Sequence, residues 1–271
     1  MPEGHTIHRA AKDHDALFAG ESLHVTSPQG RFDASPLYGR GAERTSLARV
    51  DAYGKHLFYV FERGRTVHVH LGLFGKFYKH KADPPPPRAS TRMRIAGPKG
   101  TIDLVGPTAC EIVSKAAQKA LLARLGPDPL RDDADPSAFF DYLARSKTPV
   151  GAALLDQSVI AGVGNVYRAE VLHMLKLHPL TDSRAVSRDE RERLWALLVG
   201  LMRRGVAERR IVTTQGLELA VPRKRVLRAE STFVYGRGEC RTCGGEVSRF
   251  ALRARTAHVC TRCQPYRVRA K

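Results

Sequence analysis

The sequence predicts an α+β protein with a β-rich lobe at its N-terminus, a helical lobe after it and a cysteine-rich hairpin at its end. Short runs of β-forming residues fill positions 22 to about 114, and helical periodicity replaces them over 137–210. Four of the five cysteines fall between positions 240 and 263. With 271 residues, 42% of them hydrophobic, the chain is long enough for two cores.

The first lobe is predicted to begin with one helix and to continue as an antiparallel sandwich. Over 3–18 the apolar residues fall on one helical face, Pro2 stands at the start and Gly20 ends the pattern. Strands without intervening helices, separated by Gly, Pro and Asp turns, favour antiparallel pairing. The clearest candidates are residues 46–50, 57–61, 66–71 and 101–105. This lobe is expected to span residues 1–122.

The second lobe is predicted to be helical and to follow a linker at 123–136. Proline, glycine and aspartate are frequent in that stretch, as is typical of a connection between domains. Helices are expected at 137–145, 149–155, 165–175 and 187–209. The helical domain would span 137–230, and residues 231–271 would form the terminal finger.

Two cysteine pairs indicate a metal site in that finger. Cys240 and Cys243 form one C-x2-C pair, and Cys260 and Cys263 form another. Four thiolates at this spacing are typical of a structural zinc site, which would clamp a two-stranded hairpin. The alternative is a pair of disulfides, which needs an oxidising compartment. The fifth cysteine, Cys110, is expected to be a small buried residue.

The charge of the chain favours a polyanionic partner. Its 45 Lys+Arg against 27 Asp+Glu give a formal net charge of +18. Residues 203–271 hold 17 basic and five acidic residues, so +12 of the excess lies in the last quarter. Nucleic acid is the simplest partner for such a distribution. An arginine excess that only reflects a GC-rich genome is the alternative.

The sequence gives no sign of a membrane segment or of export. It contains no run of about eighteen apolar residues, and its first residues lack a basic and an apolar region. A cytoplasmic protein is therefore expected.

A glycine-rich segment between two predicted helices is a candidate phosphate contact. Gly162 and Gly164 would let backbone N–H groups approach a phosphate at the start of the helix that opens at Asn165. Asn165 could cap this helix or donate its amide to a phosphate oxygen. A purely structural turn is the alternative.

The N-terminus is a candidate catalytic site. Removal of the initiator methionine would leave a secondary amine on Pro2, with the carboxyl group of Glu3 beside it. An α-amino group has a pKa of about 7.7–8.0, so part of it is unprotonated at neutral pH. Such an amine can attack an aldehydic carbon, and the carboxyl group can move protons. The alternative is an ordinary helix start in which the glutamate complements the helix dipole.

Five motifs in register give the chain a resemblance to a known family. They are residues 1–5 (MPEGH), 54–57 (GKHL), 125–130, 157–170 and the terminal cysteine ribbon that ends in Cys263-Gln264. Together they closely resemble the formamidopyrimidine-DNA glycosylase/endonuclease VIII family of bifunctional DNA repair glycosylases. Pro-Glu-Gly, rather than Pro-Glu-Leu, is similar to the endonuclease VIII branch.

The resemblance implies roles for individual residues. Pro2 would attack C1′ of the damaged nucleotide and form a Schiff base, with Glu3 as general acid/base. Lys55 matches a lysine that contacts phosphate beside the lesion and assists catalysis. Asn165 matches the phosphate-binding asparagine of the family's helix–two-turn–helix motif. Arg255 matches a ribbon arginine that grips phosphate and assists elimination. Gly164 and Gln157, in the same segment as the asparagine, are also expected at the DNA.

The departures from the family pattern bear on the substrate. Thr6 stands where many relatives carry a second glutamate, and Leu73 where the formamidopyrimidine branch has an intercalating methionine. Leu73 and Phe74 are the candidates for the wedge that fills the stack, with packing in the core as the alternative. Residues 106–110 lack that branch's Arg-Phe probe, and 220–232 is short for a loop that caps 8-oxoguanine. These differences favour oxidised pyrimidines.

The function expected from these observations is base excision repair. The reaction would combine release of an oxidised pyrimidine with β,δ-elimination at the abasic site. Damaged DNA is the expected partner, with one structural Zn²⁺ per chain, no redox cofactor, no membrane, a monomeric state and a place in the bacterial nucleoid. The alternatives are a formamidopyrimidine/8-oxoguanine glycosylase on the same scaffold and a non-catalytic zinc-finger protein that binds DNA damage.

Overall fold

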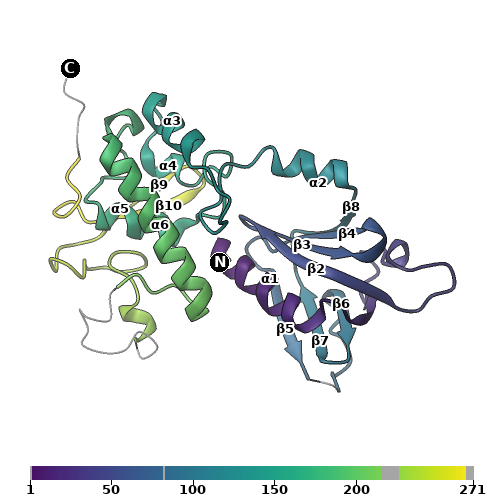
Figure 1. Cartoon of the computed structure of the whole chain (residues 1–271). Helices are drawn as coiled ribbons and strands as arrows, with labels where there is room; N and C mark the ends of the chain where they lie inside the picture. Colours follow the sequence, from purple (N-terminus) through teal and green to yellow (C-terminus); the bar gives the residue numbers. More distant parts are fainter. Residues whose placement is uncertain (1, 82, 215–225, 267–271) are drawn as a thin grey trace. The chain divides into compact units, whose positions relative to one another are not determined.

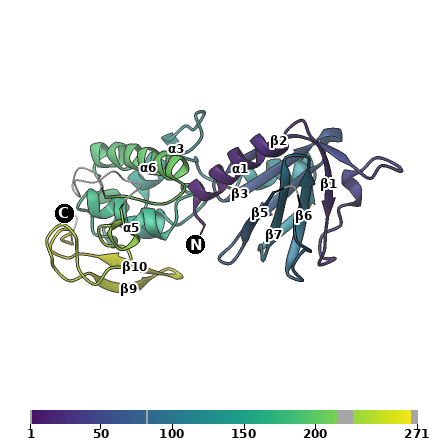
Figure 2. The same ribbon diagram turned by 90° about the horizontal axis from the view of Figure 1, so that it is seen from below.

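The computed structural model describes residues 2–81, 83–214 and 226–266, and its contacts divide the chain into two compact units. The first unit holds Pro2, Glu3 and residues 7–124, and the second holds Gly4–Thr6 and the chain from Leu125 onward. Figures 1 and 2 label the elements of both. The first turn of the N-terminal helix therefore belongs, by its contacts, with the second unit.

The first unit combines helix α1 (Gly4–Phe18) with an eight-stranded antiparallel sheet, as the sequence predicts (Figure 1). The strands are β1 (Ser22–Thr26), β2 (Thr45–Tyr53), β3 (His56–Phe61), β4 (Thr66–His70), β5 (Lys76–His80), β6 (Thr91–Gly97), β7 (Gly100–Val105) and β8 (Ala109–Val113). Their order is β5-β7-β6-β1-β2-β3-β4-β8. β1 joins the two halves, since Ser22 and Leu23 pair with β2 whereas His24–Thr26 pair with β6.

The core of this unit lies between α1 and the sheet. Alternating strand residues and the apolar face of α1 are buried together, which is the pattern of a half-buried sheet under an amphipathic helix. Cys110 lies in this core, and burial raises the pKa of its thiol to about 12, so it behaves as a small apolar residue. The helix begins one residue later than the sequence pattern indicates, with Glu3 at the N-cap position.

Helix α2 (Lys115–Leu122) follows the sheet and was not expected from the sequence. It begins at Ser114, whose Oγ accepts the N–H of Ala117 at 3.1 Å. None of its residues is buried, and its eight residues are fewer than the window of about 11–18 over which helical periodicity is read.

The second unit contains helices α3 (Ser137–Arg145), α4 (Val150–Ala153), α5 (Asn165–Met174) and α6 (Arg188–Glu208). Three of these match the sequence prediction closely, whereas the helix expected at 149–155 is a single turn of four residues. Helix α6 begins with a capping box, in which Ser187 and Glu190 satisfy each other's backbone N–H groups. Short 3₁₀ turns are η1 (Ser35–Leu37) and η2 (Glu62–Gly64) in the first unit, and η3 (Ser183–Ala185) and η5 (Arg228–Glu230) in the second.

The chain ends in the predicted hairpin, formed by β9 (Ser248–Leu252) and β10 (Arg255–Val259). Strand β10 packs against α5, and the two lie side by side in Figures 1 and 2. No helix within the described parts of the chain is long and apolar enough to cross a membrane.

Candidate functional site

The first residues of the chain are held by the loop that precedes α5. The N–H of Gly4 donates to the carbonyl oxygen of Gly162 at 2.8 Å. A Cβ atom on Gly4 would lie 2.9 Å from the Gly162 Cα and 2.8 Å from the Met202 Cε, so only glycine permits this approach. The next side chain, His5, is buried edge-on against Tyr167. The position of Pro2 and Glu3 is therefore fixed by the residue that follows them.

Glu3 is completely buried, whereas Pro2 keeps part of its surface accessible. The backbone of Glu3 is extended, and its side chain does not cap α1. A buried carboxyl group directly after an accessible proline is a suitable pair for proton transfer next to an amine. Glu3 is the N-cap residue of α1, so the alternative in which it complements the helix dipole stays open, and its catalytic role stays a prediction.

Lys55 lies in a tight turn between two strands, as expected. Gly54 and Lys55 connect β2 to β3, and Tyr53 pairs with His56 on either side of them. Gly54 has a φ of 57°, a left-handed conformation that favours glycine. The lysine side chain is half-exposed.

Leu73 and Phe74 lie in the turn between β4 and β5, and they are not part of the core. Their exposed fractions are 46% and 81%, which place them among the few large apolar side chains at the surface of the described residues. Gly72, with a φ of 65°, begins the turn, and the N–H of Gly75 closes it on the Leu71 carbonyl at 3.0 Å. The core-packing alternative is therefore wrong for both.

Gln157 shapes the glycine-rich loop from within. Its Nε2 donates to the carbonyl oxygens of Leu155 and Val163, each at 3.1 Å, and its Oε1 accepts the N–H of Gly162 at 3.0 Å. Both amide hydrogens are thus used inside the loop, while a DNA contact by this side chain stays a prediction. Gly164 is the N-cap residue of α5.

Asn165 is the first residue of α5 rather than its cap, so the capping alternative is wrong. Its Nδ2 donates to the Thr256 carbonyl at 3.0 Å, and its Oδ1 accepts from the guanidinium of Arg168. Thr256 follows the exposed Arg255 at the start of β10. The bond from Asn165 to Thr256 spans 91 residues of sequence. It brings Asn165 close to Arg255, the neighbour of Thr256, so two of the predicted phosphate contacts lie together.

Two charged residues of α5 with structural importance were missed by sequence reasoning. Arg168 is only 1% exposed and donates to the Thr256 carbonyl at 2.9 Å. Both Arg168 and Asn165 therefore attach β10 to α5. Glu170 is completely buried and accepts hydrogen bonds from the Thr213 hydroxyl and from the backbone at 233–235. Charged residues in an otherwise apolar helical segment were the available signal, since buried charges need partners.

The four ribbon cysteines form a site that fits zinc. Their sulfur atoms all lie within 4.8 Å of one another, with Sγ–Sγ distances of 3.8 Å for Cys240–Cys263 and 3.5 Å for Cys243–Cys260. A tetrahedral ion with Zn–S bonds of about 2.3 Å has S–S edges of about 3.8 Å. Among the described residues all five cysteines are free thiols, so the disulfide alternative is wrong for this structure.

The ribbon is also tied to the helices by hydrogen bonds. The side chain of Gln264 accepts the N–H of Cys260 at 3.1 Å and donates to the Leu177 carbonyl at 2.7 Å. The N–H of Gly244 bonds the Cys240 carbonyl at 2.8 Å, which closes the first cysteine turn. A metal at the four thiols would therefore stabilise the strand that carries Arg255.

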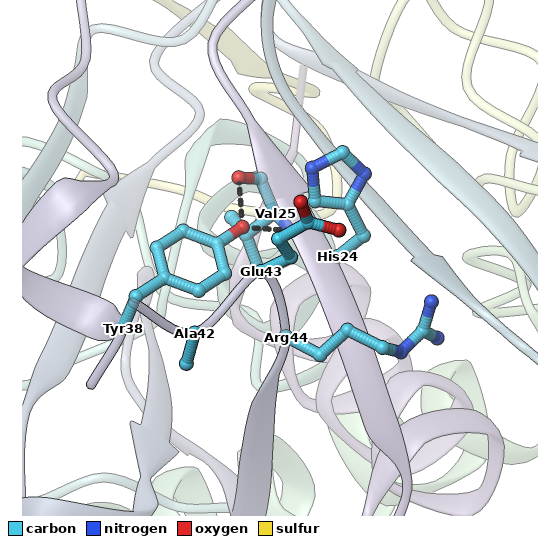
Figure 3. A pocket seen from close by; sticks show the side chains of 6 residues that line it. All are labelled: His24, Val25, Tyr38, Ala42, Glu43 and Arg44. Atoms are coloured by element: carbon cyan, nitrogen blue, oxygen red, sulfur yellow. Dashed lines mark hydrogen bonds between the residues drawn. The ribbon is translucent and has the colours of Figure 1, made fainter. Parts of the chain in front are cut away.

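A surface depression beside β1 involves none of these residues (Figure 3). Its lining consists of His24, Val25, Tyr38, Ala42, Glu43 and Arg44. The Tyr38 hydroxyl donates to the Val25 carbonyl and accepts the Val25 N–H, as the dashed lines in Figure 3 mark. Arg44 bonds Ser22, so the Tyr38 hydroxyl and the Arg44 guanidinium already have partners within the fold.

Comparisons with known proteins agree with the architecture. Residues 1–107 match the N-terminal domain of formamidopyrimidine-DNA glycosylase, and residues 125–216 match its H2TH domain. The chain is 43% identical to Endonuclease 8 1 of Mycobacterium tuberculosis over 97% of this chain and 100% of that protein. It is 30% identical to formamidopyrimidine-DNA glycosylase of Thermomicrobium roseum, over 86% of each chain.

Solved structures show the same fold. Lactococcus lactis formamidopyrimidine-DNA glycosylase, non-covalently bound to DNA with an AP site, aligns with a TM-score of 0.77 at 18% identity, over 97% of this chain and 99% of that one. The same protein with DNA that contains an oxidised pyrimidine aligns with a TM-score of 0.77 at 20% identity, over 97% and 100% of the two chains. The two domain matches and the full-length identity show that the chain belongs to the formamidopyrimidine-DNA glycosylase/endonuclease VIII family.

Proposed function

We propose that this protein is a base-excision-repair DNA glycosylase that also cleaves abasic sites, with oxidised pyrimidines as its substrates. The observation that carries the proposal is the N-terminal arrangement, in which Gly4 anchors the chain end, Glu3 is buried and Pro2 remains accessible. The higher identity to Endonuclease 8 1 than to the Thermomicrobium glycosylase supports the pyrimidine preference.

The proposed reaction uses the amine of Pro2 as the nucleophile. After removal of Met1, this amine attacks C1′ of the flipped nucleotide and the damaged base leaves. Glu3 transfers protons between the amine, the sugar and the leaving group. The resulting iminium acidifies the C2′ hydrogen, so β-elimination and then δ-elimination break the strand.

The remaining predicted residues act on the DNA rather than on the base. Lys55, Asn165 and Arg255 grip phosphates near the lesion, which positions the nucleotide without reading its sequence. The free hydrogen-bonding capacity of Asn165 supports this role, since its Nδ2 has a second hydrogen beyond the bond to Thr256. The positively charged chain adds a salt-dependent affinity for DNA.

Leu73 and Phe74 are the proposed wedge. An apolar side chain that enters the base stack can fill the space left by a flipped nucleotide. Their exposure on a short turn supports this, because adjacent apolar side chains at the surface are available to contact a partner. The four ribbon cysteines are proposed to hold one zinc ion that keeps Arg255 in place.

Borohydride trapping on DNA with an abasic site tests the proposal. The full-length protein should form a covalent adduct, because borohydride reduces the iminium on Pro2. Pro2→Gly and an N-terminal extension should greatly reduce the adduct, whereas the same extension at the C-terminus should not. A wild-type protein that binds this DNA but gives no adduct would establish the non-catalytic alternative.

Substrate choice needs a separate measurement. Base release from duplexes with thymine glycol or dihydrouracil should be faster than release from a duplex with 8-oxoguanine. The opposite order would support the formamidopyrimidine/8-oxoguanine alternative and overturn the assigned substrate.

A further inference from the structure

Three histidines and a glutamate occupy one face of the sheet directly beside the Lys55 turn. His56 begins β3, His68 and His70 lie on β4, and Glu111 lies on β8. The strand register sets His56 opposite His70 and His68 opposite Glu111. Residues that are paired across neighbouring strands lie on the same face of a sheet, and so do residues two apart on one strand, such as His68 and His70. All four side chains therefore share one face.

These side chains form a continuous hydrogen-bonded chain. The Nδ1 of His56 lies 2.9 Å from the Nε2 of His68, and the Nδ1 of His68 lies 3.1 Å from the Oε1 of Glu111. The rings of His56 and His68 are stacked, with centroids 5.1 Å apart. The chain therefore runs over three strands from the turn to Glu111.

The direction of each bond follows from the donors available. An ionised carboxylate only accepts, so the Nδ1 of His68 carries the hydrogen and its Nε2 is the acceptor. That Nε2 then accepts the hydrogen on the Nδ1 of His56. The Nε2 of His56 is left with its lone pair.

Burial, with the charges around it, keeps the His56 ring neutral. Burial, followed by the charges of His70, His68, Lys55 and Arg124, lowers its pKa to about 3. Burial and the charges of His68 and Lys55 lower the pKa of His70 as well. The groups that face the chain are thus Lys55 at the turn, His70 on β4, Arg124 after α2 and Glu111 on β8.

The middle of this hydrogen-bonded chain and its Glu111 end differ in their access to water. The side chain of His68 is only 4% exposed, whereas that of Glu111 is 59% exposed. One end can therefore exchange protons with solvent while the middle is sealed. Within the described residues the cysteine cluster is the group close enough to hold a metal, so the histidines are not assigned to one.

We propose that Glu111, His68 and His56 form a proton-transfer chain that connects the Lys55 turn with solvent. The inference rests on the proposed function, since it assigns these three side chains to proton transfer in that reaction. Glu111 and His68 are positioning residues, which fix the ring and the tautomer of His56.

The proton balance closes over β-elimination and one return step. As the Nε2 of His56 takes up the C2′ proton, the hydrogen on its Nδ1 moves to the Nε2 of His68, and the hydrogen on the Nδ1 of His68 moves to Glu111, which passes it to water. The concerted transfer leaves neither ring charged. After product release, Glu111 returns a proton from water to the Nδ1 of His68, the hydrogen on the Nε2 of His68 returns to the Nδ1 of His56, and the Nε2 of His56 loses its proton to solvent, so the net change is transfer of the C2′ proton to water.

The test compares elimination rates on preformed abasic-site DNA under single-turnover conditions. His68→Asn keeps a donor near Glu111 but cannot reach His56, and Glu111→Gln keeps an acceptor that cannot take a proton. Each should slow elimination by about ten- to a hundredfold, the range found for groups that orient metal-bound histidines. His24→Asn, an exposed histidine of the same unit, is the matched control and should keep the wild-type rate.

Chemical rescue separates proton transfer from a structural role. Added imidazole should raise the rate of His68→Asn with concentration and leave the wild-type rate unchanged, because a soluble base replaces the missing link. DNA affinity and borohydride trapping should stay within about twofold of wild type, since neither needs the chain.

Two results would overturn the inference. One is a wild-type elimination rate in both variants across pH 5.5–8.5, and the other is a loss of rate that imidazole does not restore and that follows a loss of DNA affinity. Neither bears on the proposed function, which fails only when the wild-type protein itself gives no trapped adduct.

Discussion

Glu170 offers a sharp test of how the ribbon is attached to the helical unit. The side chain is completely buried, and both oxygens are surrounded by donors. Oε1 accepts the N–H groups of Val234 at 3.0 Å and Tyr235 at 2.8 Å. Oε2 accepts the N–H of Phe233 at 2.7 Å and the hydroxyl of Thr213. The perturbation is Glu170→Gln, which keeps the shape and replaces one oxygen by an NH₂ group.

The better orientation of the glutamine follows from these donors. With NH₂ in place of Oε1, two backbone N–H groups would face another donor. With NH₂ in place of Oε2, only Phe233 loses its acceptor, because the Thr213 hydroxyl can accept and still donate to the Ser231 carbonyl at 3.1 Å. One buried N–H without a partner costs about 1–3 kcal/mol, and two charge-assisted bonds become neutral. The expected loss is about 3 kcal/mol.

The single tryptophan makes this loss measurable. Trp195 lies in α6 and packs against the core of the second unit, so its fluorescence follows the unfolding of that unit in urea. Glu170→Gln should lower the free energy of unfolding by about 3 kcal/mol. Glu170→Ala, which leaves three N–H groups without an acceptor, should lower it further. Glu246→Gln, an exposed site on the ribbon, should stay within about 0.5 kcal/mol of wild type.

The reasoning would be refuted by a Glu170→Gln protein as stable as wild type. The same holds if Glu170→Gln and Glu170→Ala lose equal stability, because the number of N–H groups left without an acceptor would then be irrelevant.

Four further predictions concern other parts of the molecule. Removal of the metal by a chelator, or Cys243→Ser, should unfold the ribbon and weaken DNA binding, with zinc release measured by a colorimetric dye; full DNA affinity in metal-free protein would contradict this. Burial lowers the pKa of His14 to about 4, so the unfolded chain binds the extra proton below pH 6.5. Stability from this group is complete above pH 6.5 and falls by about 2–3 kcal/mol towards pH 4.5, and calorimetry of His14→Gln should show a shallower loss. Phe74→Ala should change the free energy of unfolding by less than about 0.5 kcal/mol yet slow base release from duplex DNA more than from single strands. Gly4→Ala should reduce borohydride trapping and cost about 1–3 kcal/mol of stability by unfolding calorimetry, because its Cβ meets the backbone of the Gly162 loop.

The sequence predicted the elements whose faces are strongly apolar. The helices at 137–145 and 187–209 appear where periodicity indicates them, because each buries one face in a core. Helix α2 was not predicted, because its eight residues are fewer than the window of about 11–18 over which helical periodicity is read. The helix expected at 149–155 is shorter than its apolar residues suggest, since all four residues of α4 are buried and periodicity has no polar face to mark its limits.

The candidate site was predicted where local sequence carries the chemistry. Two cysteine pairs indicate a four-sulfur cluster, because the two cysteines of each pair are only three positions apart in the sequence. The partners of Asn165 and Glu170 could not be predicted, since the bonds span 91 residues to Thr256 and 63 to Phe233. The same holds for His68 and Glu111, which are 43 residues apart and meet only through strand register. Such contacts depend on packing that no local pattern contains.

The bond between Gly4 and the Gly162 carbonyl also has a consequence during synthesis of the chain. The first residues leave the ribosome well before residue 162, and domains form as they emerge, at about 5–20 residues per second. The N-terminal strands can therefore fold while the chain end still lacks its anchor. Premature termination before residue 162 would release a folded sheet in which Gly4 lacks this hydrogen-bond partner. The order of synthesis thus leaves the proposed nucleophile, Pro2, without its neighbour's anchor until the helical half of the protein has been made.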